Sequence, residues 1–140
     1  MKSLVEYILE NIQEEVNGFC ILKPEFLEHE EEFEKLLMNN KWSIIQKVKR
    51  TLSKPEAEEL YIGMNNKDFY DDLCTYMASD DSISYLCHKD CKNPIEDMKK
   101  LKDKVRKSWG KDEMKNAMHS SDSKENVERE YKLILQNKSI

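Results

Sequence analysis

The residues best suited to do chemistry gather around one histidine, His119, within residues 116–123. Imidazole has a reference pKa near 6.5, so it is largely neutral at pH 7 and can act as a nucleophile. Residues 122–125 resemble a capping box, and the free N–H groups of a helix start attract anions. The pattern indicates a histidine that could accept a phosphoryl group, although a histidine beside a helix start can also be purely structural.

A histidine that attacks phosphorus needs positive groups around the moving phosphoryl. Lys23 follows a short apolar run, and Arg106 lies in a basic segment: residues 92–115 carry nine Lys or Arg against five acids. The net charge of the whole chain is −5, so we expect a small anionic ligand rather than nucleic acid. A solvated helix face is the alternative explanation of the basic segment.

Length and composition favour a single domain spanning residues 1–140, of which 39% are hydrophobic. The short apolar runs predict no membrane span, and without a recognisable secretory segment we expect a cytoplasmic protein with reduced thiols. One alternative for the cysteines is a partial zinc site built on Cys87, His88 and Cys91.

Periodicity predicts the elements that must position these groups. An α+β sandwich with helices on one side of a small sheet is the expected architecture. Helices are predicted over residues 4–16, 26–39, 55–60, 69–77, 94–105 and 122–134, and strands over residues 18–22, 42–48 and 83–87, with a further short strand before the last helix.

Five collinear blocks resemble the nucleoside diphosphate kinase family. Residues 116–123 resemble its signature N-x-x-H-G-S-D-S, and residues 21–25 resemble its strand ending in I-K-P-D. Leu60-Tyr61, Phe69, Leu73 and Tyr76-Met77 resemble its H-Y … F-F … L … Y-M block; Val105-Arg106 with Trp109-Gly110 resembles I-R … F-G; residues 128–130 match A-E-R-E. The resemblance implies a ferredoxin-like βαββαβ sandwich, a small antiparallel sheet covered by helices, with residues 1–17 as an additional N-terminal helix.

The resemblance also implies an activity and a site. It implies a Mg²⁺-dependent enzyme that moves the terminal phosphoryl group of ATP or another nucleoside triphosphate to a nucleoside diphosphate through phosphohistidine at His119. The implied catalytic residues are His119, Lys23, Glu130 and Ser121, and the implied nucleotide-binding residues are Lys23, Tyr61, Phe69, Leu73, Lys99, Arg106 and Asn116. Phe69 would stack on the base, Glu130 would accept from the imidazole, and Asp122 would help place magnesium indirectly, through water and phosphates.

The chain departs from the family pattern at several positions. Ser120 replaces the glycine after the histidine, and Phe26 replaces the glycine of K-P-D-G. Lys99 falls at the position of a phosphate-binding arginine, and a loop with its threonine is missing between Leu101 and Arg106. Because that loop builds threefold contacts in hexameric members, we expect a dimer.

These departures keep two other functions open. The chain could be a catalytically weak nucleotide-binding or regulatory module on the same fold. It could also keep the phosphohistidine and pass the phosphoryl group to a non-nucleotide acceptor.

Overall fold

The computed structural model describes residues 3–6 and 16–136 of the chain. Its sheet has four antiparallel strands in the order β2-β3-β1-β4. The strands are β1 (Gly18–Leu22), β2 (Ser43–Thr51), β3 (Asp81–His88) and β4 (Met118–Ser120). The helices are α2 (Glu30–Asn39), α3 (Lys54–Leu60), α4 (Tyr70–Met77), α5 (Pro94–Trp109) and α6 (Lys124–Gln136), with 3₁₀ turns η1 (Leu27–His29) and η2 (Ile62–Met64).

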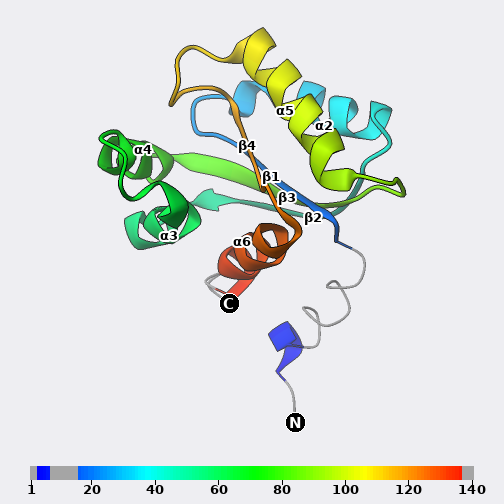
Figure 1. Ribbon diagram of the computed structural model, residues 1–140, viewed down its shortest axis with the longest axis horizontal. Coiled ribbons are helices and arrows are strands. Elements are labelled where there is room, and N and C mark those ends of the chain that lie inside the picture. The colour runs from blue at the N-terminus through cyan, green and yellow to red at the C-terminus, as the bar shows by residue number, and fades with distance from the viewer. Residues whose placement is uncertain (1–2, 7–15, 137–140) are drawn as a thin grey trace.

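The core of this arrangement is a βαββαβ unit formed by β1, α2, β2, β3, α5 and β4 (Figure 1). It confirms the predicted ferredoxin-like fold. The central strand β1 is buried along its whole length, because it pairs with β3 on one side and β4 on the other. Burial on both faces explains why its sequence is a continuous apolar run rather than an alternating one.

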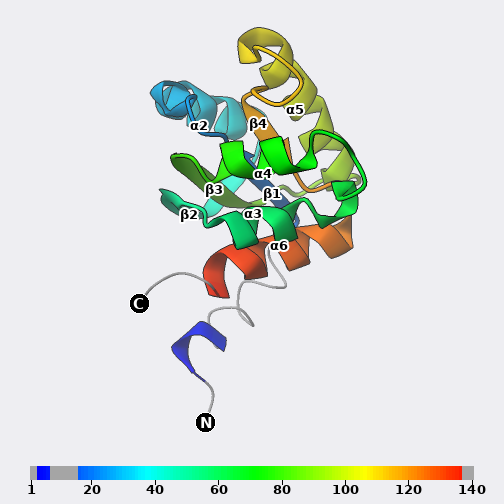
Figure 2. The ribbon, with the colours of Figure 1, turned by 90° about the vertical axis from the view of Figure 1, so that its left-hand side faces the viewer.

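Helices cover both faces of the sheet, so the expectation that they lie on one side is wrong. Figure 2 shows α2 and α5 on one side of the sheet and α3 and α6 on the other. Successive side chains of β1 point to opposite faces of the sheet and pack in different hydrophobic clusters. Phe19 and Ile21 pack with α3, α4 and α6. Cys20 and Leu22 pack with α2 and α5. Periodicity could not assign a face to each helix.

Helix α5 runs without interruption through residues 101–106, where the family pattern has its loop. It opens with Pro94 at its first turn and ends before Gly110. A side chain at Gly110 would place a Cβ 2.4 Å from the Arg106 carbonyl oxygen. Only glycine therefore allows the backbone to pass this close to the end of the helix.

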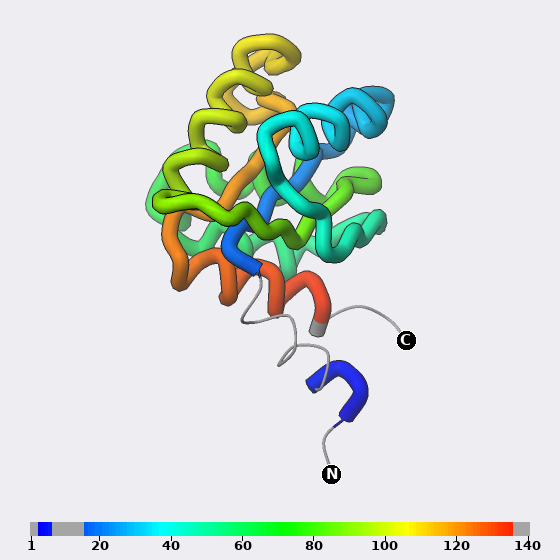
Figure 3. Tube along the Cα trace, turned by 90° about the vertical axis from the view of Figure 1, so that its right-hand side faces the viewer, coloured from blue at the N-terminus to red at the C-terminus, as the bar shows by residue number. Residues whose placement is uncertain are grey.

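The N-terminal helix predicted over residues 4–16 falls largely outside the described residues. Residues 4–6 are helical, and the Ser3 hydroxyl accepts from the backbone N–H of Glu6. Figure 3 shows the rest of the described chain ending in α6, across the sheet from α2 and α5. In the described parts of the chain, no helix is both long enough and apolar enough to cross a membrane.

Candidate active site

Strand β4 and helix α6 together position His119 and its carboxylate partner. The pairing of β4 with β1 sets His119 opposite Ile21. Helix α6 starts after Ser123, whose hydroxyl accepts from the backbone N–H of Asn126, and it carries Glu130 inward. The Nε2 atom of His119 lies 2.5 Å from Oε1 of Glu130, a side chain that is only 3% exposed. Because a carboxylate accepts, the neutral ring donates from Nε2, and the lone pair resides on Nδ1.

The ring of Tyr61 packs against the imidazole of His119. Helix α3 begins with a capping box between Ser53 and Glu56, and its last residue directly precedes Tyr61. The Tyr61 ring meets the His119 ring edge to face, with centroids 5.1 Å apart. Burial raises the pKa of the Tyr61 hydroxyl, and its oxygen has no hydrogen-bond partner among the described residues.

Lys23 lies at the end of β1 with its ammonium group buried. Its backbone N–H donates to the Ala117 carbonyl at 2.9 Å, and Nζ donates to the Met114 carbonyl at 3.2 Å. Nζ also lies 5.9 Å from the centre of the Tyr61 ring. Burial, followed by the nearby charges of Arg106 and Lys102, lowers the pKa of Lys23 to about 7. Lys23 is therefore a cation that a bound anion would readily stabilise.

The last turns of α5 bring two more cations toward the histidine. Arg106 Nε donates to the Met118 carbonyl, next to His119 in β4, at 3.0 Å. Among the described residues Nη1 and Nη2 of Arg106 have no hydrogen-bond partner, so the outer edge of the guanidinium can bind another group. Burial lowers the pKa of Arg106, and burial together with Arg106 lowers the pKa of Lys102.

All of these groups except Lys23 line a pocket of about 310 Å³, which we call the histidine pocket. It includes Lys102, which the sequence did not single out. The available signal was the spacing of Lys99, Lys102 and Arg106, which places all three on one face of a helix. The pocket is lined by Leu60, Tyr61, Gly63, Met64, Lys102, Arg106, His119, Ser120, Asp122, Asn126, Arg129 and Glu130.

Asp122 is the exposed carboxylate of this pocket, and its Oδ1 accepts from Asn126 Nδ2 at 2.7 Å. Within residues 3–6 and 16–136 no cluster of three or more His, Cys, Asp or Glu side chains could hold a metal. An exposed carboxylate such as Asp122 at this pocket fits Mg²⁺, which usually binds through one or two carboxylates plus substrate phosphates.

A second pocket of about 450 Å³, the Phe69 pocket, lies between α4 and residues 112–114. Phe69 is 45% exposed, and Leu73 is buried in the core beneath it. The remaining lining residues are Asp72, Asp112, Glu113 and Met114. Lys23 links the two pockets, since its Nζ donates to Met114 and lies over Tyr61.

Three other residues suggested by the resemblance, Asn116, Ser121 and Lys99, do not line the histidine pocket. Asn116 Nδ2 donates to the Glu113 carbonyl beside the Phe69 pocket. The backbone N–H of Ser121 donates to the Phe19 carbonyl, while its buried hydroxyl has no partner in the described chain. Lys99 is exposed on α5 and does not line the histidine pocket.

The glycine replacements are accommodated by the backbone. Neither Ser120 nor Phe26 has a positive φ, so neither position requires glycine. Near the site, the left-handed conformations fall on Glu25 (φ 75°), which directly precedes Phe26, and on Ala117 (φ 78°), whose carbonyl accepts from the backbone N–H of Lys23. The backbone strain near the site therefore lies on these two residues and not on the replaced positions.

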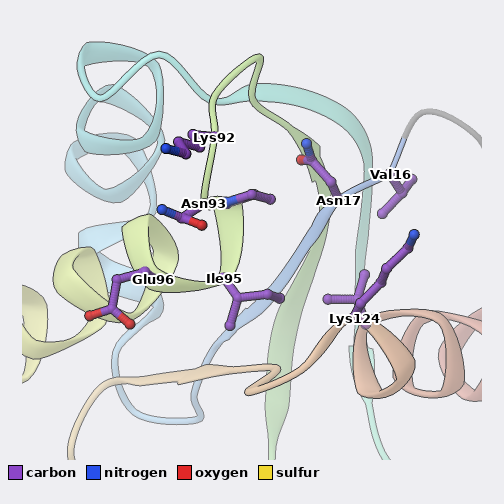
Figure 4. Close-up of a pocket in the computed structure, with 9 residues that line it drawn as sticks. Val16, Asn17, Lys92, Asn93, Ile95, Glu96 and Lys124 are labelled. Atoms are coloured by element: carbon purple, nitrogen blue, oxygen red, sulfur yellow. The ribbon is translucent and has the colours of Figure 1, made fainter.

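A larger pocket of about 650 Å³ lies apart from His119, where β1 begins and the first turns of α5 and α6 meet (Figure 4). Its walls include Val16, Ile95 and Lys124.

The candidate zinc ligand Cys87 is buried against Cys20, and the Cys91 thiol interacts with Asp97.

Comparison with known proteins agrees with this geometry. The family model described as nucleoside diphosphate kinase matches residues 16–140. Nucleoside diphosphate kinase homolog 5 of Homo sapiens is 26% identical over 126 residues, covering 82% of this chain and 59% of that protein. Nucleoside diphosphate kinase of Hyperthermus butylicus is 30% identical over 97 residues, covering 64% of this chain and 68% of that protein. The chain thus spans less than two thirds of the human relative.

Solved structures show the same fold. A crystal structure of Aquifex aeolicus nucleoside diphosphate kinase superposes with a TM-score of 0.76 at 20% identity, covering 84% of this chain and 92% of that one. The apo structure of the Encephalitozoon cuniculi enzyme gives the same TM-score at 19% identity. With a family match over most of its length and this shared fold, the chain belongs to the nucleoside diphosphate kinase family.

Proposed function

We propose that this chain is a phosphotransferase that carries the terminal phosphoryl group of a nucleoside triphosphate on Nδ1 of His119. One observation carries the proposal: His119 lies in a cationic pocket with Nε2 held by Glu130, which leaves Nδ1 as the ring nitrogen with a lone pair. The buried carboxylate also stabilises the positive charge that develops on the ring during attack.

In the first half-reaction the Nδ1 lone pair attacks the γ-phosphorus. An N–P bond forms as the bond from phosphorus to the bridging oxygen breaks, and the nucleoside diphosphate leaves with that electron pair. In the second half-reaction a terminal oxygen of another diphosphate attacks the phosphohistidine, and the electron pair returns to Nδ1. Arg106 and Lys23 would stabilise the phosphate charge in both directions.

The two pockets suggest how a nucleotide would lie. The phosphates would occupy the histidine pocket and the base would stack on Phe69, above Leu73. Lys23 and Asn116 donate to the carbonyls of Met114 and Glu113, which line the Phe69 pocket, and Lys23 Nζ also lies 5.9 Å from the centre of the Tyr61 ring, which lines the histidine pocket. Both side chains would therefore contact the sugar and the phosphates between the two pockets. The exposed Lys99 would reach a nucleotide only at the rim, and Ser121 would act by fixing the start of α6.

The donor would enter as its magnesium complex. When bound, Mg²⁺ would offset the negative charge of the phosphates. Asp122 would hold that complex at the mouth of the pocket, through water.

Phosphoryl transfer to the protein tests this proposal. Incubation with γ-labelled ATP and magnesium should give an acid-labile, base-stable label on the wild-type chain, and added nucleoside diphosphate should remove it. His119→Ala should take no label, while His29→Ala, which alters a histidine away from the pocket, should be labelled normally. A wild-type chain without label would refute the proposal.

A weak nucleotide-binding module is the second candidate, favoured by the uninterrupted α5 and the exposed Lys99. Calorimetry with ADP beside a coupled kinase assay separates the two candidates, because only the module would bind without turnover. A panel of phosphorylated metabolites tests the third possibility, a non-nucleotide acceptor. We also propose a cytoplasmic dimer, since the segment used for threefold contacts in hexameric members is replaced by helix.

A further inference from the structure

Helix α5 presents three cations on one face, but the described pocket includes only two of them. Lys99, Lys102 and Arg106 are spaced by three and four residues, so their side chains follow one another along the helix. Lys102 and Arg106 line the histidine pocket, whereas Lys99 is exposed outside its lining. The position that aligns with the family's arginine is therefore not the one that faces His119.

Lys102 is half-buried without a partner. Among residues 3–6 and 16–136 it has neither an ion pair nor a side-chain hydrogen bond, although Asp103 and Asp122 are near enough to favour its charge. Burial and the like charge of Arg106 disfavour its protonated form and lower its pKa. A bound anion in the histidine pocket would favour the protonated form of this ammonium group.

The helical course of α5 explains why a new cation lies here. Lys102 precedes Arg106 by one turn, in the segment where the family pattern has a loop. Side chains four residues apart on a helix lie about 5–6 Å from one another at Cβ, close enough to contact neighbouring phosphates of one chain. Arginine can bind two oxygens with its planar fork, and the flexible lysine adds a movable point charge.

We propose that Lys102 is a phosphate-binding residue of the histidine pocket. In this role it replaces the family's phosphate-binding arginine, whose aligned position in this chain is Lys99. The inference deepens the proposed nucleotide site and rests on it. Its ligand class is a nucleoside di- or triphosphate, because Lys102 and Arg106 together match a run of at least two phosphates. The loss of the family's loop is thereby compensated from within α5.

Calorimetry with Mg-ADP and with adenosine tests this assignment without requiring turnover. Lys102→Met keeps the aliphatic stem and removes the charge, so it should weaken ADP binding about tenfold or more and leave adenosine binding unchanged. Lys102→Arg should restore most of the ADP affinity. Lys104→Met, an equal loss of charge on an exposed position of the same helix, should bind ADP as the wild type does.

The outcomes distinguish this inference from the proposed function. If Lys99→Met weakens ADP binding more than Lys102→Met, or if the Lys102 variant loses adenosine and ADP affinity equally, the assignment is wrong. A wild-type chain that binds ADP no better than adenosine overturns it as well. A chain that binds ADP through Lys102 but never labels His119 would keep this inference and refute the proposed phosphotransfer.

Discussion

The histidine pocket and the Phe69 pocket each have a lining residue in contact with Lys23, namely Tyr61 and Met114, but the two pockets have opposite character. The first carries Lys102, Arg106 and Arg129 around the imidazole, while the second has apolar side chains with acidic residues at its edges. The first is built on β4 and long helices, and the second depends on residues 112–114 of a connecting segment. In the proposed arrangement, the histidine pocket would bind the reacting phosphates between a strand and helices, and the Phe69 pocket would bind the base beside a loop.

The largest effect should come from the carboxylate behind the imidazole. Glu130→Gln keeps the shape of the side chain but removes the charge that stabilises the ring during attack. We expect phosphotransfer to fall roughly 10²- to 10⁴-fold, with ADP affinity changed little. Glu125→Gln, at an exposed position of the same helix, is the control. Equal rates for Glu130→Gln and wild type would remove Glu130 from the mechanism.

Arg106 tests whether the histidine pocket is the phosphate half of the site. Arg106→Met should weaken ADP binding on the order of 10- to 100-fold, because charge-assisted hydrogen bonds to phosphate are lost. Adenosine should bind as before, and calorimetry measures both ligands. Lys107→Met, which alters the next residue of α5 at an exposed position, should leave both affinities unchanged. A parallel loss of adenosine affinity would contradict the division between the pockets.

The pH dependence of binding tests Lys23, which lies between the pockets. The pKa of Lys23 is about 7 in the free chain, and a bound phosphate must raise it by favouring the ammonium form. ADP affinity should therefore level off well below pH 7 and fall as the pH rises above 7, by up to about tenfold per unit. Titrations from pH 7 to 9 should show this slope in the wild type and not in Lys23→Met. A flat wild-type profile would mean that Lys23 does not bind the phosphates.

The smallest effect should arise in the Phe69 pocket. Phe69→Ala removes a half-exposed stacking surface, so adenosine and ADP should both bind about five- to tenfold more weakly. The equal loss is the diagnostic feature, since the phosphates do not touch this ring in the proposed arrangement. Tyr70→Phe, next to Phe69 and outside both linings, is the matched control. Loss of ADP affinity alone would place the base elsewhere.

Much of the fold follows from the sequence because apolar periodicity is local. The buried run of β1, the Pro94 start of α5 and the serine at the start of α6 each predict an element that the structure contains. The distribution of helices over both faces did not follow, because Phe19 and Cys20 are adjacent in sequence yet pack in different cores. Which core a helix joins is decided by tertiary packing, which periodicity does not report.

The candidate site shows the same limit. The resemblance located His119, Glu130, Arg106 and Lys23, which the structure brings together around Tyr61. It pointed to Lys99, which is exposed and does not line the histidine pocket, and not to Lys102, which does. Phe69 and Leu73 were both expected at the nucleotide site, and both line the Phe69 pocket, although only Phe69 is substantially exposed. Alignment matches residue types by position in the sequence, whereas the path of the helix decides which side chains of α5 line the pocket.

The position of the phosphoryl group on the imidazole ring shows directly whether Nδ1 of His119 is the nucleophile. The wild-type chain is phosphorylated with ATP and magnesium, and NMR spectroscopy identifies the modified nitrogen. We expect one phosphohistidine, at His119, with phosphorus on Nδ1 and a proton retained on Nε2 beside Glu130. Phosphorus on Nε2, or on another residue, would contradict it.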